Sequence, residues 1–162
     1  MRTLLLNILL INATGAYGQS LAEMDSLVRA AGSIRNSNQL AQSRQLAVAK
    51  GYGPSALFVL AALFNKEGET GIYSDCRKRN LTEGEVAMIF ADGIEWMPYA
   101  TLTGMQNCTL TFCEDNLNKI EYYFGVIHLI GVETFQKRYL NWLNGKERKR
   151  YLKEERRLRG NR

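Results

Sequence analysis

The chain has 162 residues, a length that suits one domain able to bury its own core. Hydrophobic residues make up 46% of it and there are only two prolines, so the composition argues against a disordered chain. Its formal net charge of +5 is unevenly spread, because residues 146–162 contain nine of the 21 Lys/Arg but only three of the 16 Asp/Glu. The basic character therefore belongs to the C-terminal tail, and the overall charge is a poor guide to partners.

Residues 1–18 have the pattern of a secretory signal peptide. Arg2 supplies the positive charge, Leu4 to Ile11 the apolar run, and Ala16-Tyr17-Gly18 a small-x-small cleavage site before Gln19. The run is too short to anchor the chain in a membrane, which takes about twenty apolar residues. We therefore expect a periplasmic or secreted protein. The alternative is that these residues form an amphipathic or buried N-terminal helix.

The rest of the chain up to residue 145 shows helical spacing of apolar residues and no convincing pair of strands. The predicted helices are Leu21 to Ala31, Ser37 to Lys50, Pro54 to Lys66, Glu83 to about Met97, Asn116 (capped by Asp115) to about Leu129, and Val132 to Leu143. Tyr99 to Thr111 is predicted to be a loop or a short helix. The expected fold class is all-α, a small bundle of five or six helices in one domain over residues 19–145.

Two of these helices, at residues 54–66 and 83–97, form the predicted centre of the fold. The first opens with Pro54, which suits the first helical position, and it is apolar on every side, so it must be buried. The second starts at a T-x-x-E capping box, Thr82 to Glu85, in which both side chains satisfy free backbone N–H groups. We expect the two helices to pack antiparallel, joined by a polar loop at residues 67–80.

Three cysteines, Cys76, Cys108 and Cys113, would meet an oxidising compartment if the protein is exported. Cys108 and Cys113 could close a small loop, whereas Cys76 with either of them would close a larger one and constrain the unfolded chain more. Because the number of cysteines is odd, at least one thiol is free or paired between molecules. The sequence does not decide which cysteines pair. There is neither a C-x-x-C motif nor a His/Cys cluster, so we expect no metal site and no cofactor.

No catalytic residues can be assigned, and we expect that the protein is not an enzyme. His128 lies between Ile127 and Leu129 and is interpreted as a packed, hydrogen-bonded core histidine, since no nucleophile or carboxylate stands at a telling spacing.

The tail, residues 146–162, is expected to be helical because Glu, Lys and Arg have high helix propensity. It would form a solvated, fraying helix. The alternatives are contact with nucleic acid or with an anionic membrane, which such charge supports without specificity.

The stretch between Pro54 and Pro98 carries a further pattern, formed by Phe58-Val59, Ala62-Leu63 and Asn65 in its first helix and by Tyr73, Cys76, Thr82 and Pro98 in its second part. In this pattern it resembles the small periplasmic immunity proteins that neutralise type VI secretion effectors, a group that includes amidase inhibitors. The resemblance covers roughly a quarter of the chain, and it implies a function by analogy. Ala56 stands where that family has its first cysteine and Ala62 where glycine is usual. The family's disulfide from helix to loop therefore cannot form as usual, and Cys76 would need Cys108 or Cys113.

We therefore expect an exported, non-enzymatic binding protein, in particular an immunity protein or inhibitor that occludes a toxic effector such as a secreted hydrolase. One alternative is a periplasmic structural or adaptor component of a secretion or conjugation apparatus. Another, for a chain that is not exported, is a cytoplasmic nucleic-acid-binding protein. The sequence leaves open whether the protein forms a homodimer. We expect no specific nucleic-acid partner and no transmembrane segment.

Four residues are candidate anchors for a protein partner: Tyr73 and Arg77 in the Cys76 loop, and Trp96 and Tyr99 around Pro98. Tyr, Trp and Arg dominate interface hot spots because they bury large areas at low entropy cost or make forked hydrogen bonds. The alternative is that Trp96 and Tyr99 simply cover the core.

Overall fold

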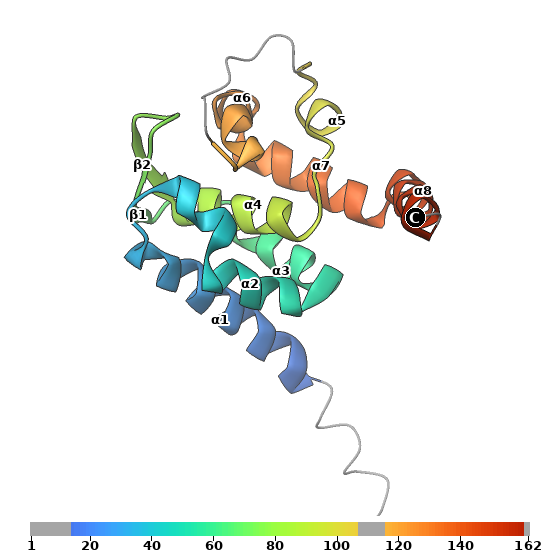
Figure 1. Cartoon of the computed structure of the whole chain (residues 1–162), viewed down its shortest axis with the longest axis horizontal. Coiled ribbons are helices and arrows are strands. Elements are labelled where there is room, and N and C mark those ends of the chain that lie inside the picture. Colours follow the sequence, from blue (N-terminus) through green and yellow to red (C-terminus); the bar gives the residue numbers. More distant parts are fainter. Residues whose placement is uncertain (1–13, 107–115, 161–162) are drawn as a thin grey trace, which may run out of the picture.

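Helices dominate the structure, a computed structural model that describes residues 14–106 and 116–160. The longer elements, drawn in Figure 1, are α1 (Thr14–Ala30), α2 (Arg44–Gly51), α3 (Ala56–Leu63), β1 (Glu69–Ser74), β2 (Arg79–Thr82), α4 (Glu83–Ile94), α5 (Tyr99–Thr103), α6 (Phe124–Ile130), α7 (Val132–Asn144) and α8 (Lys146–Gly160). The short 3-10 helices between them are η1 (Ala31–Ser33), η2 (Ser37–Gln42), η3 (Gly53–Ser55) and η5 (Lys119–Tyr123). Cys108, Cys113, Asp115 and most of the predicted signal peptide lie outside the described residues.

A β-hairpin between α3 and α4 corrects the prediction of a purely helical fold. β1 and β2 pair antiparallel where the sequence predicts a polar loop. The side chains of β1 alternate between solvent and core, with Thr70, Ile72 and Ser74 facing inward. Two of these three inward residues are polar, so the apolar alternation typical of a half-buried strand is missing from the sequence. Hydrogen bonds compensate for their burial; the Thr70 hydroxyl donates to the Leu81 carbonyl at 2.7 Å.

The α3–α4 pair lies at the centre of the fold, and the two helices run antiparallel, as predicted (Figure 1). The predicted capping box is present: the Thr82 hydroxyl accepts from the Glu85 N–H at 3.1 Å, and the Glu85 carboxylate accepts from the Thr82 N–H at 3.0 Å. The end of α3 meets the start of α4 so closely that a Cβ at Gly84 would come within 2.1 Å of the Phe64 carbonyl oxygen. Only glycine permits this approach of the two backbones.

Both central helices are shorter than predicted. α3 ends at Leu63, and Phe58 on its outer side is exposed, so this helix is not buried all round. α4 ends at Ile94 because the chain turns back, and the Asp92 carboxylate accepts from the Met97 N–H at 3.1 Å.

The second half of the core is built from aromatic side chains of α5, η5, α6 and α7. Phe64 packs against Phe135 and Tyr139, with ring centroids 6.0 and 5.4 Å apart. Tyr99 and Tyr123 stack at 4.5 Å. The single helix predicted over residues 116–129 is divided into η5 and α6, and the turn from α6 to α7 is made by Gly131 at a φ of 88°.

The N-terminal helices also differ in detail from the prediction. α1 runs through the predicted cleavage site, and its buried Met24 and Val28 lie beyond Gly18, so cleavage there would leave them in place. The polar helix predicted at residues 37–50 is divided into η2 and α2 at Ser43, whose hydroxyl caps α2 by accepting from the Leu46 N–H at 3.1 Å.

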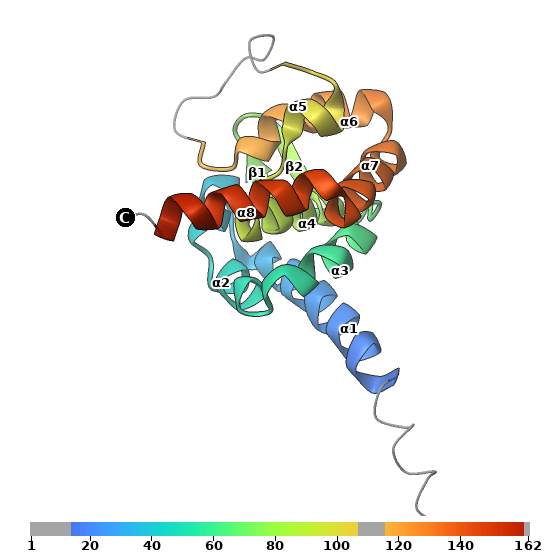
Figure 2. The same ribbon diagram turned by 90° about the vertical axis from the view of Figure 1, so that its right-hand side faces the viewer.

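α8 crosses one side of the body and is held there by its first turns (Figure 2). Arg148 donates to both carboxylate oxygens of Glu95 at 2.7 and 2.8 Å, and Tyr151 packs against Trp96 with ring centroids 5.7 Å apart. The tail is therefore a helix docked through these residues, and not only a solvated one.

Across residues 14–106 and 116–160, no single helix is long and apolar enough to cross a membrane. The α2–α3 pair meets those criteria only together, and it is bent by 104°.

Candidate interaction site

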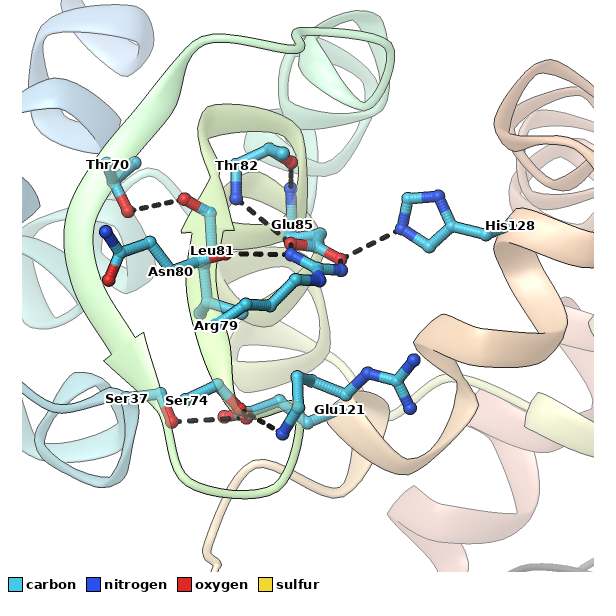
Figure 3. Close-up of polar contacts among 11 residues, drawn as sticks. Ser37, Thr70, Ser74, Arg79, Asn80, Leu81, Thr82, Glu85, Glu121 and His128 are labelled. Carbon is cyan, nitrogen blue, oxygen red and sulfur yellow. Dashed lines mark hydrogen bonds and ion pairs between the residues drawn. The ribbon is translucent and has the colours of Figure 1, made fainter.

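The turn of the hairpin is fastened to the body by a buried carboxylate, that of Glu121 in η5 (Figure 3). Glu121 has 0% exposure. Its Oε2 accepts from the hydroxyls of Ser74 and Ser37 at 2.5 and 3.1 Å, and its Oε1 accepts from the side-chain amide of Asn118 at 2.9 Å. All three donors are buried and neutral, so these hydrogen bonds replace the water that the carboxylate has lost. Because Ser74 ends β1, they join the hairpin turn to η2 and η5.

A second buried carboxylate, Glu85, lies at the base of the hairpin (Figure 3). Its side chain is 2% exposed. Arg79 of β2 donates from both Nη atoms to the two carboxylate oxygens at 2.8 and 2.5 Å, and His128 Nε2 lies 3.0 Å from Oε1. An ionised carboxylate only accepts hydrogen bonds, so Nε2 is the protonated nitrogen of His128.

The electrostatics of this cluster favour the ionised carboxylate. Burial by itself raises the pKa of Glu85, but the hydrogen bonds from Arg79, from His128 and from the Thr82 N–H together outweigh burial and lower it. The hydrogen bond to Glu85 in turn raises the pKa of Arg79. The pair is therefore a charged, two-pronged contact that fixes β2 on α4.

His128 corrects part of the sequence interpretation. It is hydrogen-bonded, as predicted, but its side chain is 45% exposed, so it is not a core residue. Its carboxylate partner lies 43 residues away in the sequence. No local spacing could have revealed the pair, because α4 and α6 meet only through the tertiary fold.

Two adjoining hollows lie beside His128. The first, of about 550 Å³, is bordered by Arg77 and Arg79, and the second, of about 430 Å³, by Lys66 and Glu133. They share Glu67, Thr82 and His128. We call the joint surface lined by these side chains the hairpin groove. It carries both positive and negative side chains, which suits a polar segment of a partner.

The candidate anchors Tyr73 and Arg77 both lie on the hairpin. Tyr73 is 39% exposed, while its backbone N–H donates to the Arg35 carbonyl at 2.9 Å. Arg77 is half-buried, and its guanidinium packs over Gly125, where an added Cβ would lie 3.3 Å from each Nη. Its buried Nε has no hydrogen-bond partner, and it takes part in none of the ion pairs among the described residues. Arg77 thus brings an unpaired positive charge to the hairpin groove.

Trp96 and Tyr99 lie beyond the other end of α4, whose 12 residues separate them from the hairpin by about 18 Å. Tyr99 is 5% exposed and donates its hydroxyl to Asp92 at 2.6 Å, so it fills the core and presents no surface. Burial, followed by the charge of Asp92, raises its pKa. Trp96 is 47% exposed but packs between Tyr99 and Tyr151, at 5.9 and 5.7 Å. The four candidates therefore form two separate pairs, and of the four only Arg77 lines the hairpin groove.

The remaining candidates concern cysteines and metals. Cys76 lies in the hairpin turn, where the Asn116 amide donates to its Sγ at 3.0 Å. Cys108 and Cys113 lie outside the described residues, so the disulfide stays a prediction. Within residues 14–106 and 116–160, no three His, Cys, Asp or Glu side chains form a group that could hold a metal ion.

Comparison with protein-family models, with curated proteins and with solved structures finds no match for this chain.

Proposed function

We propose that this protein is an exported, non-enzymatic binding protein that inhibits a toxic effector by covering its active site with the β1–β2 hairpin. The observation that carries the proposal is a hairpin held by buried hydrogen bonds that presents Tyr73 and the unpaired Arg77. The export component rests on the pattern of residues 1–18, and the immunity component on the pattern between Pro54 and Pro98.

The hairpin is ordered before any partner arrives, which favours binding. Immobilising a flexible side chain on association takes about 0.5–1.5 kcal/mol from the binding free energy. Here the Glu121 carboxylate holds Ser74, and the Asn36 amide donates to Asp75 at 2.6 Å on the turn itself. A partner therefore meets a surface already in its bound shape.

Tyr73 and Arg77 supply different kinds of binding energy. Tyr73 offers a rigid aromatic face, which buries a large area with few torsions to fix. Arg77 has already lost part of its hydration without gaining an anion, so a carboxylate on the partner would satisfy its forked donors. Trp96, exposed at the other end of α4, is a secondary anchor that Tyr99 supports from beneath.

A disulfide from Cys76 to Cys108 or Cys113 belongs to the same proposal, because it would tie the hairpin turn to residues 107–115 and constrain the unfolded chain. The measurement is intact mass after thiol alkylation, with and without reduction. We expect one alkylated cysteine without reduction and three after it. Three alkylated cysteines without reduction would contradict the disulfide.

The test of function begins with capture of the partner from the periplasmic fraction, using the mature chain as bait and mass spectrometry for identification. Calorimetric titration of the captured partner then compares wild type with Tyr73→Ala/Arg77→Ala. We expect the double variant to lose more than tenfold in affinity, which corresponds to about 1.4 kcal/mol. The matched control is Tyr52→Ala/Arg44→Ala, which removes an exposed tyrosine and arginine from α2 and its C-terminal end.

Three outcomes separate the parts of the proposal. Loss of affinity in the double variant together with relief of the partner's inhibition supports occlusion by the hairpin. Normal affinity in the double variant refutes the hairpin as the contact. A partner with no enzymatic activity, such as a component of a secretion or conjugation apparatus, refutes inhibition and favours the adaptor alternative.

A further inference from the structure

α8 is docked on the body through one side only. The Arg148 guanidinium is paired with Glu95, lies 5.8 Å from the centre of the Trp142 ring, and is 12% exposed. Tyr151, one turn further, packs on Trp96. Both residues mark the side of α8 that faces the body, so the opposite side is the outer surface of the molecule in Figure 2.

The outer side of α8 carries a row of cations. At 3.6 residues per turn, five of them fall within roughly 100° of the helix circumference, centred away from Arg148 and Tyr151. They are Lys146, Lys149, Lys153, Arg156 and Arg157, and all five are exposed. None of them belongs to an ion pair among the described residues. We call this surface the basic face of α8.

The described acidic residues of α8 do not balance these charges. Glu147 and Glu154 lie on another side of the helix, where they line a hollow of about 220 Å³ with Trp96 and Pro98. In a helix that is merely solvated, opposite charges commonly alternate and pair at a spacing of three or four residues. In α8 Arg150 lies with Glu147 and Glu154 on their side of the helix, whereas neither of these two acids lies on the basic face, which leaves an uncompensated positive potential there.

We propose that the basic face of α8 adsorbs the protein onto the surface of an anionic phospholipid bilayer. The geometry favours a flat partner, because Arg148 and Tyr151 hold the inner side of the first turns of α8 on the body, while the basic face runs along the outer side of the helix. Nucleic-acid readout by a helix requires entry into a groove about 8.5 Å deep, which the docked first turns of α8 do not achieve. This inference is independent of the inhibitor function, since it concerns a different surface of the protein.

The adsorption is electrostatic and does not involve insertion. An inserting amphipathic helix needs a broad apolar side, whereas the large apolar residues described on α8 are Tyr151, Leu152 and Leu158, and Tyr151 is packed on Trp96. Each cation close to an anionic surface multiplies the partition coefficient by about five. The attraction acts within a Debye length of about 8 Å at physiological ionic strength, so salt reverses it.

Co-sedimentation of the full chain with lipid vesicles tests the proposal. The probes are vesicles of phosphatidylcholine with about one-third phosphatidylglycerol, and vesicles of phosphatidylcholine alone, at ionic strengths from about 0.05 to about 0.5 M. We expect binding to the anionic vesicles only, and its loss at the highest salt. Lys149→Gln/Lys153→Gln/Arg156→Gln should lower the partition coefficient about a hundredfold, at about fivefold for each cation.

The control variant, Arg35→Gln/Arg44→Gln/Lys50→Gln, changes three exposed cations that are not on α8. Its net charge equals that of the α8 triple variant. It should bind anionic vesicles within about threefold of wild type, since those charges belong to α2 and to the segment before η2 and not to the basic face of α8. Far-UV circular dichroism checks that both variants keep their helices. Equal loss in the two variants, binding to neutral vesicles, or tighter binding of a short DNA duplex than of the anionic vesicles at the same salt would overturn the proposal.

Discussion

Removing the Glu121 carboxylate should destabilise the fold from its interior and loosen the proposed binding surface at a distance. Glu121→Ala deletes three hydrogen bonds and leaves the donors of Ser37, Ser74 and Asn118 buried. A hydrogen bond to a charged group contributes about 1.5–3 kcal/mol, and the desolvation of the carboxylate offsets part of that sum. We expect a loss of about 3–5 kcal/mol in the free energy of unfolding, because each buried neutral donor left without an acceptor costs about 1–3 kcal/mol.

Glu121→Gln is the conservative control, because it keeps the shape and one acceptor oxygen. The serine hydroxyls can rotate to accept from the new amide group, so we expect a loss of about 1–2 kcal/mol. Urea denaturation followed by circular dichroism measures both variants. Hydrogen exchange at the Tyr73 N–H, which donates to Arg35, reports whether the hairpin itself loosens.

Two results would refute this reasoning about Glu121. If Glu121→Ala unfolds at the same urea concentration as wild type, the buried hydrogen bonds add nothing net to stability. If it is destabilised but exchange at Tyr73 keeps its wild-type protection relative to global unfolding, the carboxylate supports the core without fixing the hairpin.

Three further predictions concern other parts of the chain. The pKa of Glu85 is lowered from 4.5 in the folded state, so its contribution to stability is complete above pH 4.5 and is lost as the pH falls through the folded-state pKa. Glu85→Gln should lack this acid-dependent loss, and urea denaturation of both proteins across the acid range measures it. Gly84→Ala would place a Cβ 2.1 Å from the Phe64 carbonyl oxygen and should lower the melting temperature by about 4–8 degrees or more, which corresponds to about 2 kcal/mol or more. Gly32→Ala, with nothing within 4 Å, should change the melting temperature little, and equal melting of the two variants would contradict the close approach. Intact mass of protein from the periplasm should correspond to a chain starting near Gln19, and a mass that retains residues 1–18 would disprove export by this signal.

The local signals of the sequence were enough to place most of the helices and one of their caps. The Thr82–Glu85 capping box was predicted and is present, because all of its hydrogen bonds lie within four consecutive residues. The burial of Phe90 likewise follows from helical spacing of apolar residues, and that of Leu57 and Leu60 from an apolar run without a polar break, both properties of the chain alone.

The hairpin and the two carboxylates that hold it were decided by the tertiary structure. β1 turns two polar side chains inward, which is stable only because Leu81 and Glu121 accept their hydrogen bonds. Glu121 meets Ser37 across 84 residues and Ser74 across 47. A sequence pattern reports which side of a helix is apolar, but it cannot report which distant donors will surround a buried charge, because that depends on how the helices pack against one another. The anchors Tyr73 and Tyr99 differ for the same reason: both are tyrosines beside a turn, and only packing leaves one exposed and the other buried.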